Sequence, residues 1–179
     1  DKVKWVQVDL GERVDMKKII LHACHDDHNN IGAGFGFPVR FQIIASNRAD
    51  FSRSQVLMDE SGRDFANPGL VPIEHGVQSS ARYIRVKATK LAPRSNDFIF
   101  ALAELEVLDG NDKNRALKAK VSSIDSIEAP NRWRRSNLTD GIWAQGSDKA
   151  STRAIAKLNK EKAALMANLQ TPERMKRLT

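Results

Sequence analysis

Residues 4–10 read Lys-Trp-Val-Gln-Val-Asp-Leu, and this stretch decides the fold class of the chain. Apolar and polar residues alternate along it, so that Val6, Val8 and Leu10 share one face. A strict two-residue period is typical of a β-strand with one buried and one exposed face. The polar pair that follows, Gly11-Glu12, favours a turn. The stretch therefore predicts a half-buried strand that ends near residue 10.

The same kind of pattern recurs along the chain. Further strands are predicted at 17–24, 39–46, 54–59, 81–89, 99–108 and 116–123. Glycine, proline and small polar residues predict loops between them, at 25–37, 61–72 and 91–97. No helical period separates the strands within the first 110 residues. Short strands without intervening helices indicate an all-β fold, an antiparallel β-sandwich.

The distribution of charge changes near Gly110. Residues 1–110 carry 14 Lys and Arg against 15 Asp and Glu, whereas residues 111–179 carry 15 against 7. We expect three parts: a sandwich at 1–110, a segment at 111–148, and an α-helical appendage at 149–179, where apolar residues recur at helical spacing. The basic residues are scattered and lack an accompanying set of aromatic residues, so we expect no nucleic-acid partner.

Several classes of protein are disfavoured by simple counts. No run of about 18 apolar residues exists, which predicts no membrane span. Cys24 is the only cysteine, so an internal disulfide is impossible. We find no nucleophile elbow and no ordered Ser/His/Asp motif, and we expect no enzymatic activity. The N-terminus begins almost inside a strand without signal-peptide character, so we expect a fragment of a longer protein.

Four segments together carry a family resemblance. They are WVQVDLG at 5–11, FPVRFQIIAS at 37–46, ARYIRVKAT at 81–89 and ALAELEVLDG at 101–110. In this order and spacing they resemble the discoidin family, the coagulation-factor type C domain, which overlaps the family 32 carbohydrate-binding modules. The resemblance implies a galactose-binding-like jelly roll whose ligand site lies on loops at one end.

Domains of this family begin with a strand and a loop that are missing ahead of WVQVDLG. Residues 116–143 resemble that missing opening, including its Asp-Gly turn. Either a second repeat is cut short here, or the segment folds back and completes the first sheet, as in a circular permutation. We favour completion because an open sandwich would expose an unpaired edge. A dimer in which two chains exchange this segment would also cover the unpaired edge.

The resemblance also implies a structural calcium ion. In family 32-like modules the opening Asp-Gly loop and a glutamate on the last strand often hold it, and the matching residues are Asp140 and Glu104. Calcium takes several oxygen ligands from carboxylates and carbonyls, which a loop supplies readily. The alternative is that Glu104 simply faces solvent on an alternating strand, as we expect of Glu106.

Two loops carry the polar chemistry expected of a sugar site. Sugars are bound by planar donors and acceptors, with an aromatic face against the ring. The predicted ligand-binding residues are His25, His28, Asn29, Asn30 and Phe35 in one loop, and Arg94, Asn96 and Phe98 in the other. The alternative for each is a solvated loop with a buried phenylalanine. We expect Trp5 and Trp133 to belong to the core.

These observations favour one function over another. The first is a non-catalytic carbohydrate-binding module, for a galactose-type or related glycan, that belongs to a larger bacterial extracytoplasmic protein and lies beside its other domains. The second is a structural or protein-interaction sandwich that shares the fold and lacks a sugar ligand. Fold resemblance alone cannot choose between them, because one fold supports many functions.

Overall fold

The computed structural model describes residues 2–27 and 31–145. The chain divides into two units, residues 1–144 and 145–179, and the description below concerns the first. The elements are β1 (Lys4–His22), β2 (Cys24–Asp26), β3 (Gly32–Phe35), β4 (Arg40–Ser46), β5 (Gln55–Glu60), β6 (Ile73–Lys90), β7 (Ala92–Arg94), β8 (Asp97–Ile99), β9 (Glu104–Asp109), β10 (Lys120–Ser123) and the short 3₁₀ helix η2 (Arg135–Thr139). The predicted helical appendage at 149–179 lies outside the described residues.

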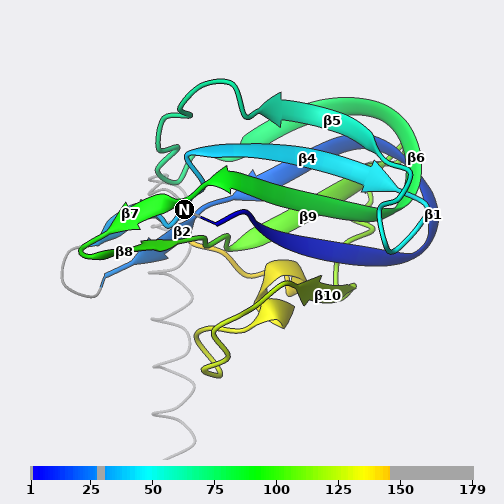
Figure 1. Ribbon diagram of the computed structural model, residues 1–179. Helices are drawn as coiled ribbons and strands as arrows, with labels where there is room; N and C mark the ends of the chain where they lie inside the picture. The colour runs from blue at the N-terminus through cyan, green and yellow to red at the C-terminus, as the bar shows by residue number, and fades with distance from the viewer. Residues whose placement is uncertain (1, 28–30, 146–179) are drawn as a thin grey trace, which may run out of the picture. The chain divides into compact units, whose positions relative to one another are not determined.

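The fold is an all-β antiparallel sandwich, as the alternating pattern predicts. The main sheet has the order β10-β1-β6-β4-β5, and β9 also pairs with β1. The long strands β1 and β6 remain paired with each other along most of their length while they curve, so both contribute to two layers (Figure 1). The first half of β1 pairs with β10 and its second half with β9.

The prediction of two separate strands at 4–10 and 17–24 was wrong. The chain does not leave the sheet between them but bends within β1, where the register shifts between Asp9 and Val14 and again between Met16 and Lys18. Gly11 takes a φ of +82° at the first of these irregularities. Such bulges bend a strand without ending its pairing, so the polar residues that suggest a turn mark a curve instead.

The core lies between the two layers and follows the alternation seen in the sequence. Val8 on β1 and Leu105 on β9 are fully buried, and Phe41 on β4 is buried with them. Gln7, which the alternation assigns to the outer face, accepts hydrogen bonds from the Arg85 guanidinium at Oε1. The apolar core therefore consists of one face of each strand, as the period-two pattern requires, while Gln7 on the other face of β1 is also buried.

Residues 116–144 pack on the same core as the strands before them. Strand β10 pairs antiparallel with the first half of β1, and Val8 stands opposite Val121. Ala116 and Leu138 are buried in the common core. Strand β10 thus covers an edge that β1 would otherwise leave unpaired. The domain limits 1–110, 111–148 and 149–179 stay a prediction.

Two predicted loops contain short hairpins. Strands β2 and β3 pair within 24–35, and β7 and β8 pair within 92–99. Figure 1 shows β2, β7 and β8 at one end of the sandwich, away from the bend of β1 and β6. The pairing within these hairpins gives the two polar loops a defined backbone structure at this end of the sandwich. Within the part of the chain that the structure describes, no helix is long and apolar enough to cross a membrane.

Candidate functional site

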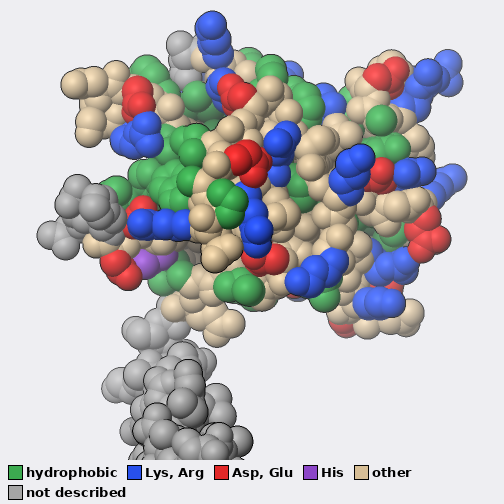
Figure 2. Space-filling model, turned by 90° about the horizontal axis from the view of Figure 1, so that it is seen from below, with side chains coloured by type: hydrophobic (Ala, Val, Ile, Leu, Met, Phe, Trp, Pro, Cys, Tyr) green, Lys and Arg blue, Asp and Glu red, His purple; other side chains and the backbone are tan. Residues whose placement is uncertain are grey.

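A cleft of about 910 Å³ lies at the end of the sandwich that carries the two hairpins. Its walls come from the start of β1, from β2–β3, from β7–β8 with the residues that follow, and from the segment 123–144. Figure 2 shows the underside of the molecule, where hydrophobic side chains gather toward this end with Lys and Arg side chains around them. The size is that of a pocket for a small ligand.

Aromatic side chains from distant parts of the chain line the cleft. The Trp133 ring meets the Phe35 ring edge-on, with centroids 5.9 Å apart. Trp143 stacks on His22 at a centroid distance of 4.2 Å. Phe98, on β8, is 56% exposed although it is a large apolar side chain. Trp133 and Trp5 are both half-buried lining residues of the cleft, so the expectation that they belong to the core was wrong.

Basic side chains also line the cleft, and most of them are held by carboxylates. Arg132 pairs with the buried Asp26 of β2, and so ties the segment 123–144 to the first hairpin. Arg94 Nε donates to Asp97 Oδ1 at 2.8 Å across the β7–β8 turn, and this hydrogen bond lowers the pKa of Asp97. Ion pairs of this kind position a guanidinium without removing all of its donors.

The structure brings most of the described, predicted ligand-binding residues together. His25, Phe35, Arg94 and Phe98 all line the cleft, so the two loops converge there. Asn96 lies exposed in the turn between β7 and β8 and is not a lining residue. The remaining three predicted residues, His28, Asn29 and Asn30, lie outside the described residues.

Sequence reasoning missed the wall formed by residues 131–135. Arg132, Trp133 and Arg134 line the cleft, and Asp26 holds the first of them. One signal was present, since an aromatic residue flanked by arginines is a common composition for a binding loop. Nothing local shows that this loop returns to β2, which precedes it by 106 residues at the Asp26–Arg132 pair.

The predicted metal ligands Glu104 and Asp140 also lie close together. Glu104 is fully buried, and its Oε1 accepts a hydrogen bond of 3.1 Å from the backbone N–H of Gly141. No group among residues 2–27 and 31–145 forms a hydrogen bond with its Oε2. Burial, and after it the negative charges of Asp140 and Glu106, raises the pKa of Glu104 to about 8. The alternative that Glu104 faces solvent was wrong.

This arrangement fits a calcium ion in part. A buried carboxylate oxygen without a partner, next to a second carboxylate and a loop with carbonyl groups, matches the oxygen ligands that calcium prefers. However, no group of three or more His, Cys, Asp or Glu side chains comes together among residues 2–27 and 31–145. Backbone carbonyls or water would have to supply the remaining ligands.

Comparison with known proteins gives structural likenesses alone. No protein-family model and no curated protein matches the chain. Similar solved structures include the C-terminal domain of a chitobiase from Bacteroides fragilis, with 18% identity over 68% of this chain and a TM-score of 0.41. A family 32 carbohydrate-binding module of a family 89 glycoside hydrolase from Clostridium perfringens matches with 18% identity over 56% of this chain and a TM-score of 0.38.

A third similar structure is the lectin domain of lectinolysin, solved with Lewis B antigen, with 26% identity over 59% of this chain and a TM-score of 0.40. The matched regions cover 66%, 66% and 64% of the three other chains, in the order given. The chain thus spans just under two thirds of the length of each of these three structures.

Proposed function

We propose that residues 1–144 form a non-catalytic carbohydrate-binding module and that the cleft is its sugar site. One observation carries the proposal: four segments far apart in the sequence converge to line a pocket with aromatic rings and planar polar groups. Such a lining suits a galactose-type or related glycan, whose ring has an apolar face and a rim of hydroxyls. The resemblance to the discoidin family, drawn from the strands, points to the same end of the fold.

We assign different tasks to the lining residues on the basis of their contacts. Trp133 is the platform for the apolar face of the sugar, because its contact with Phe35 fixes the orientation of the ring. Arg94 and Arg132, each already oriented by a carboxylate, offer their remaining N–H groups to sugar hydroxyls. A pocket with preoriented donors loses little side-chain entropy on binding.

Binding without catalysis agrees with the chemistry of the described cleft residues. The strongest nucleophile by type is Cys24, and burial raises the pKa of its thiol to about 11. The reactive thiolate is therefore scarce at neutral pH. The Asp26 carboxylate is occupied by Arg132, which favours a role in positioning.

We also propose that Glu104 and Asp140 take part in a structural calcium site. The support is the buried, unpartnered Oε2 of Glu104 beside the Asp140–Gly141 turn. Calcium would supply the positive charge that a buried carboxylate requires, and it would hold the segment that carries Trp143 against β9. The wider context, a larger bacterial protein outside the cytoplasm, is part of the same proposal and rests on the resemblance of the strands.

Replacement of Trp133 by alanine tests the sugar site. We expect Trp133→Ala to weaken binding of the best glycan by about 2 kcal/mol, or about 30-fold in Kd, because it removes an aromatic platform from the wall of the cleft. Titration calorimetry, guided by a glycan array, measures this effect. Phe51→Ala is the matched control, since Phe51 is also a half-buried aromatic residue but does not line the cleft.

Two results would contradict the proposal. If the wild-type protein binds no glycan on the array at millimolar concentration, the domain is a structural or protein-interaction sandwich. If glycans bind but Trp133→Ala and Phe51→Ala leave Kd equally unchanged, the sugar site lies elsewhere. Circular dichroism of both variants verifies that each retains its β-sheet.

A further inference from the structure

The cleft wall contains more basic than acidic side chains. Among the lining residues there are five Lys and Arg and three Asp, namely Lys4, Arg94, Arg132, Arg134 and Arg135 against Asp26, Asp125 and Asp140. Two carboxylates outside the lining, Asp97 and Glu128, offset part of this excess, so the field that a ligand meets depends on the cations left without an ion pair. Neutral sugars gain nothing from this field, whereas a sugar that carries a negative charge does.

The five cations differ in how they are neutralised. Four of them form ion pairs: Lys4 with Asp125, Arg94 with Asp97, Arg132 with Asp26 and Arg135 with Glu128. Arg134 differs, because its Nε donates at 2.8 Å to Oδ1 of Asn137, a neutral amide. Within the described residues, Arg134 takes part in no ion pair. It is therefore the lining cation with charge left for a ligand.

Arg134 is also well placed for a sugar that rests on the aromatic platform. It follows Trp133 directly in the chain, and both line the cleft. Its hydrogen bond to Asn137 uses only Nε, and it leaves the other guanidinium N–H groups unassigned. A guanidinium offers parallel N–H donors that match the two oxygens of a carboxylate.

We propose that the cleft selects glycans whose bound residue carries a carboxylate, a hexuronic or sialic acid, and that Arg134 receives this group. The inference rests on the proposed sugar site and adds the class of its ligand. A sulfate ester presents similar chemistry, because a guanidinium also binds tetrahedral oxyanions through two parallel N–H groups, and the test below separates the two groups.

A glycan array that holds matched neutral, carboxylated and sulfated glycans tests the selection. We expect carboxylated glycans to give the strongest signals. In calorimetry, D-galacturonic acid should bind about tenfold more tightly than D-galactose, as expected for a charge-assisted pair. Arg134→Gln should reduce this ratio to about one, because the variant loses the guanidinium that pairs with the carboxylate.

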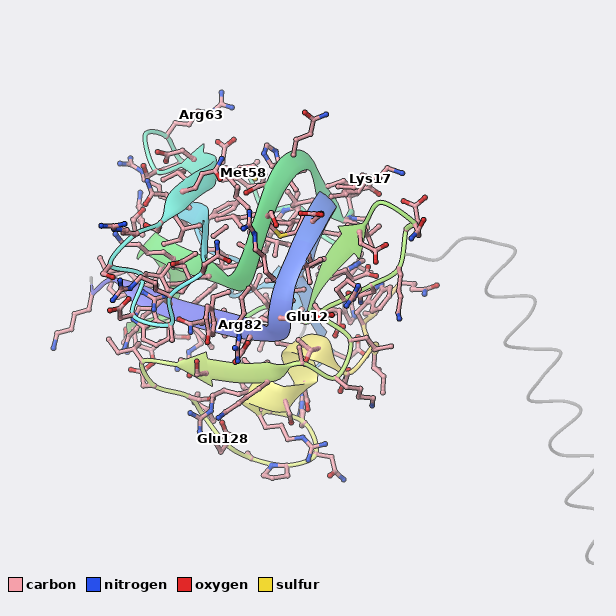
Figure 3. All side chains as sticks on the ribbon, turned by 90° about the vertical axis from the view of Figure 1, so that its right-hand side faces the viewer. Glu12, Lys17, Met58, Arg63, Arg82 and Glu128 are labelled. Atoms are coloured by element: carbon pink, nitrogen blue, oxygen red, sulfur yellow. The ribbon has the colours of Figure 1, made fainter. Side chains whose placement is uncertain are left out.

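Arg63→Gln is the charge-matched control. Arg63 is 83% exposed on its side chain, and Figure 3 shows it on the loop after β5, on the opposite side of the molecule from the loop that carries Glu128. Arg63→Gln removes one positive charge, as Arg134→Gln does. The ratio between the affinities for D-galacturonic acid and D-galactose should therefore persist in this control.

The possible failures are separable. Binding of neutral glycans alone, or of sulfated glycans alone, would overturn the carboxylate selection and leave the sugar site intact. A ratio that persists in Arg134→Gln would overturn the role of Arg134. The absence of any glycan binding would overturn the sugar site itself.

Discussion

Replacement of Gly34 by alanine should lower the free energy of unfolding by about 3 kcal/mol, from backbone strain together with overpacking. Gly34 lies in β3 with a φ of +78°, a left-handed conformation that disfavours any side chain. A Cβ at this position would lie 1.6 Å from Oδ1 of Asn67. Asn67 cannot move freely, because that oxygen accepts a hydrogen bond of 2.8 Å from the Gly69 N–H. Urea unfolding measures the change.

Two further variants separate backbone strain from overpacking as causes of this loss of stability. Gly62→Ala is the control, since a Cβ there meets nothing within 4 Å and the backbone is not left-handed; its effect should stay below about 1 kcal/mol. In Gly34→Ala with Asn67→Ala the steric conflict is gone and the backbone strain remains, so part of the stability should return. Equal stability of Gly34→Ala and the wild type would show that β3 does not pack on Asn67 as described.

The second large effect concerns Glu104 and pH. In the presence of a chelator, we expect the free energy of unfolding to fall as pH rises from about 5 to about 8. The folded protein retains a proton on Glu104 up to a pKa of about 8, whereas the unfolded chain releases it near the ordinary value of 4.5. The stabilising difference is complete below the unfolded pKa and is lost as pH rises through the folded one, with a slope of at most about 1.4 kcal/mol per pH unit.

Glu104→Gln should flatten this profile. Glutamine has nearly the same shape and keeps an acceptor for the Gly141 N–H, but it has no charge to bury. Urea unfolding of chelator-treated protein at a series of pH values measures the slope. A wild-type slope that survives in Glu104→Gln would assign the pH dependence to another group.

Calcium should offset the loss of stability that the buried Glu104 carboxylate causes at high pH. At a concentration 100 times its Kd, calcium should stabilise the wild-type protein by about 2.7 kcal/mol. At one fixed calcium concentration the gain should be larger at pH 8 than at pH 6, because a ligand must lose its proton before it binds the metal. Glu104→Gln should lose the calcium response. Glu106→Gln should keep it, since the Glu106 carboxylate is already bonded to His22 and Asn114.

Thermal unfolding of the wild type and of Glu104→Gln, with calcium and with a chelator, tests the calcium site. Identical Tm values for the wild type in both would refute the calcium site and leave the pH prediction standing. A calcium response in Glu104→Gln equal to that of the wild type would place the ion elsewhere.

Some features of the fold were predictable from the sequence, and others were not. The alternation around Val8 and Ile84 predicted which side chains are buried, because a strand places successive residues on opposite faces. The same reasoning misjudged the bend at Gly11, since a bulge and a turn use similar residues. The convergence of His25 and Arg94 in one cleft was expected only through the family resemblance.

The amino-acid sequence by itself determined the all-β class, the faces of the strands and the polar character of the loops at one end. These properties depend on neighbours within a few residues. Only the tertiary structure placed Trp133 and Arg132 against β2 and buried Glu104 beside Gly141. Such contacts join residues that lie tens of positions apart, and they depend on the curve of β1 and on the register of β10 against it. No local pattern carries that information, because register and curvature arise from the packing of the whole sandwich.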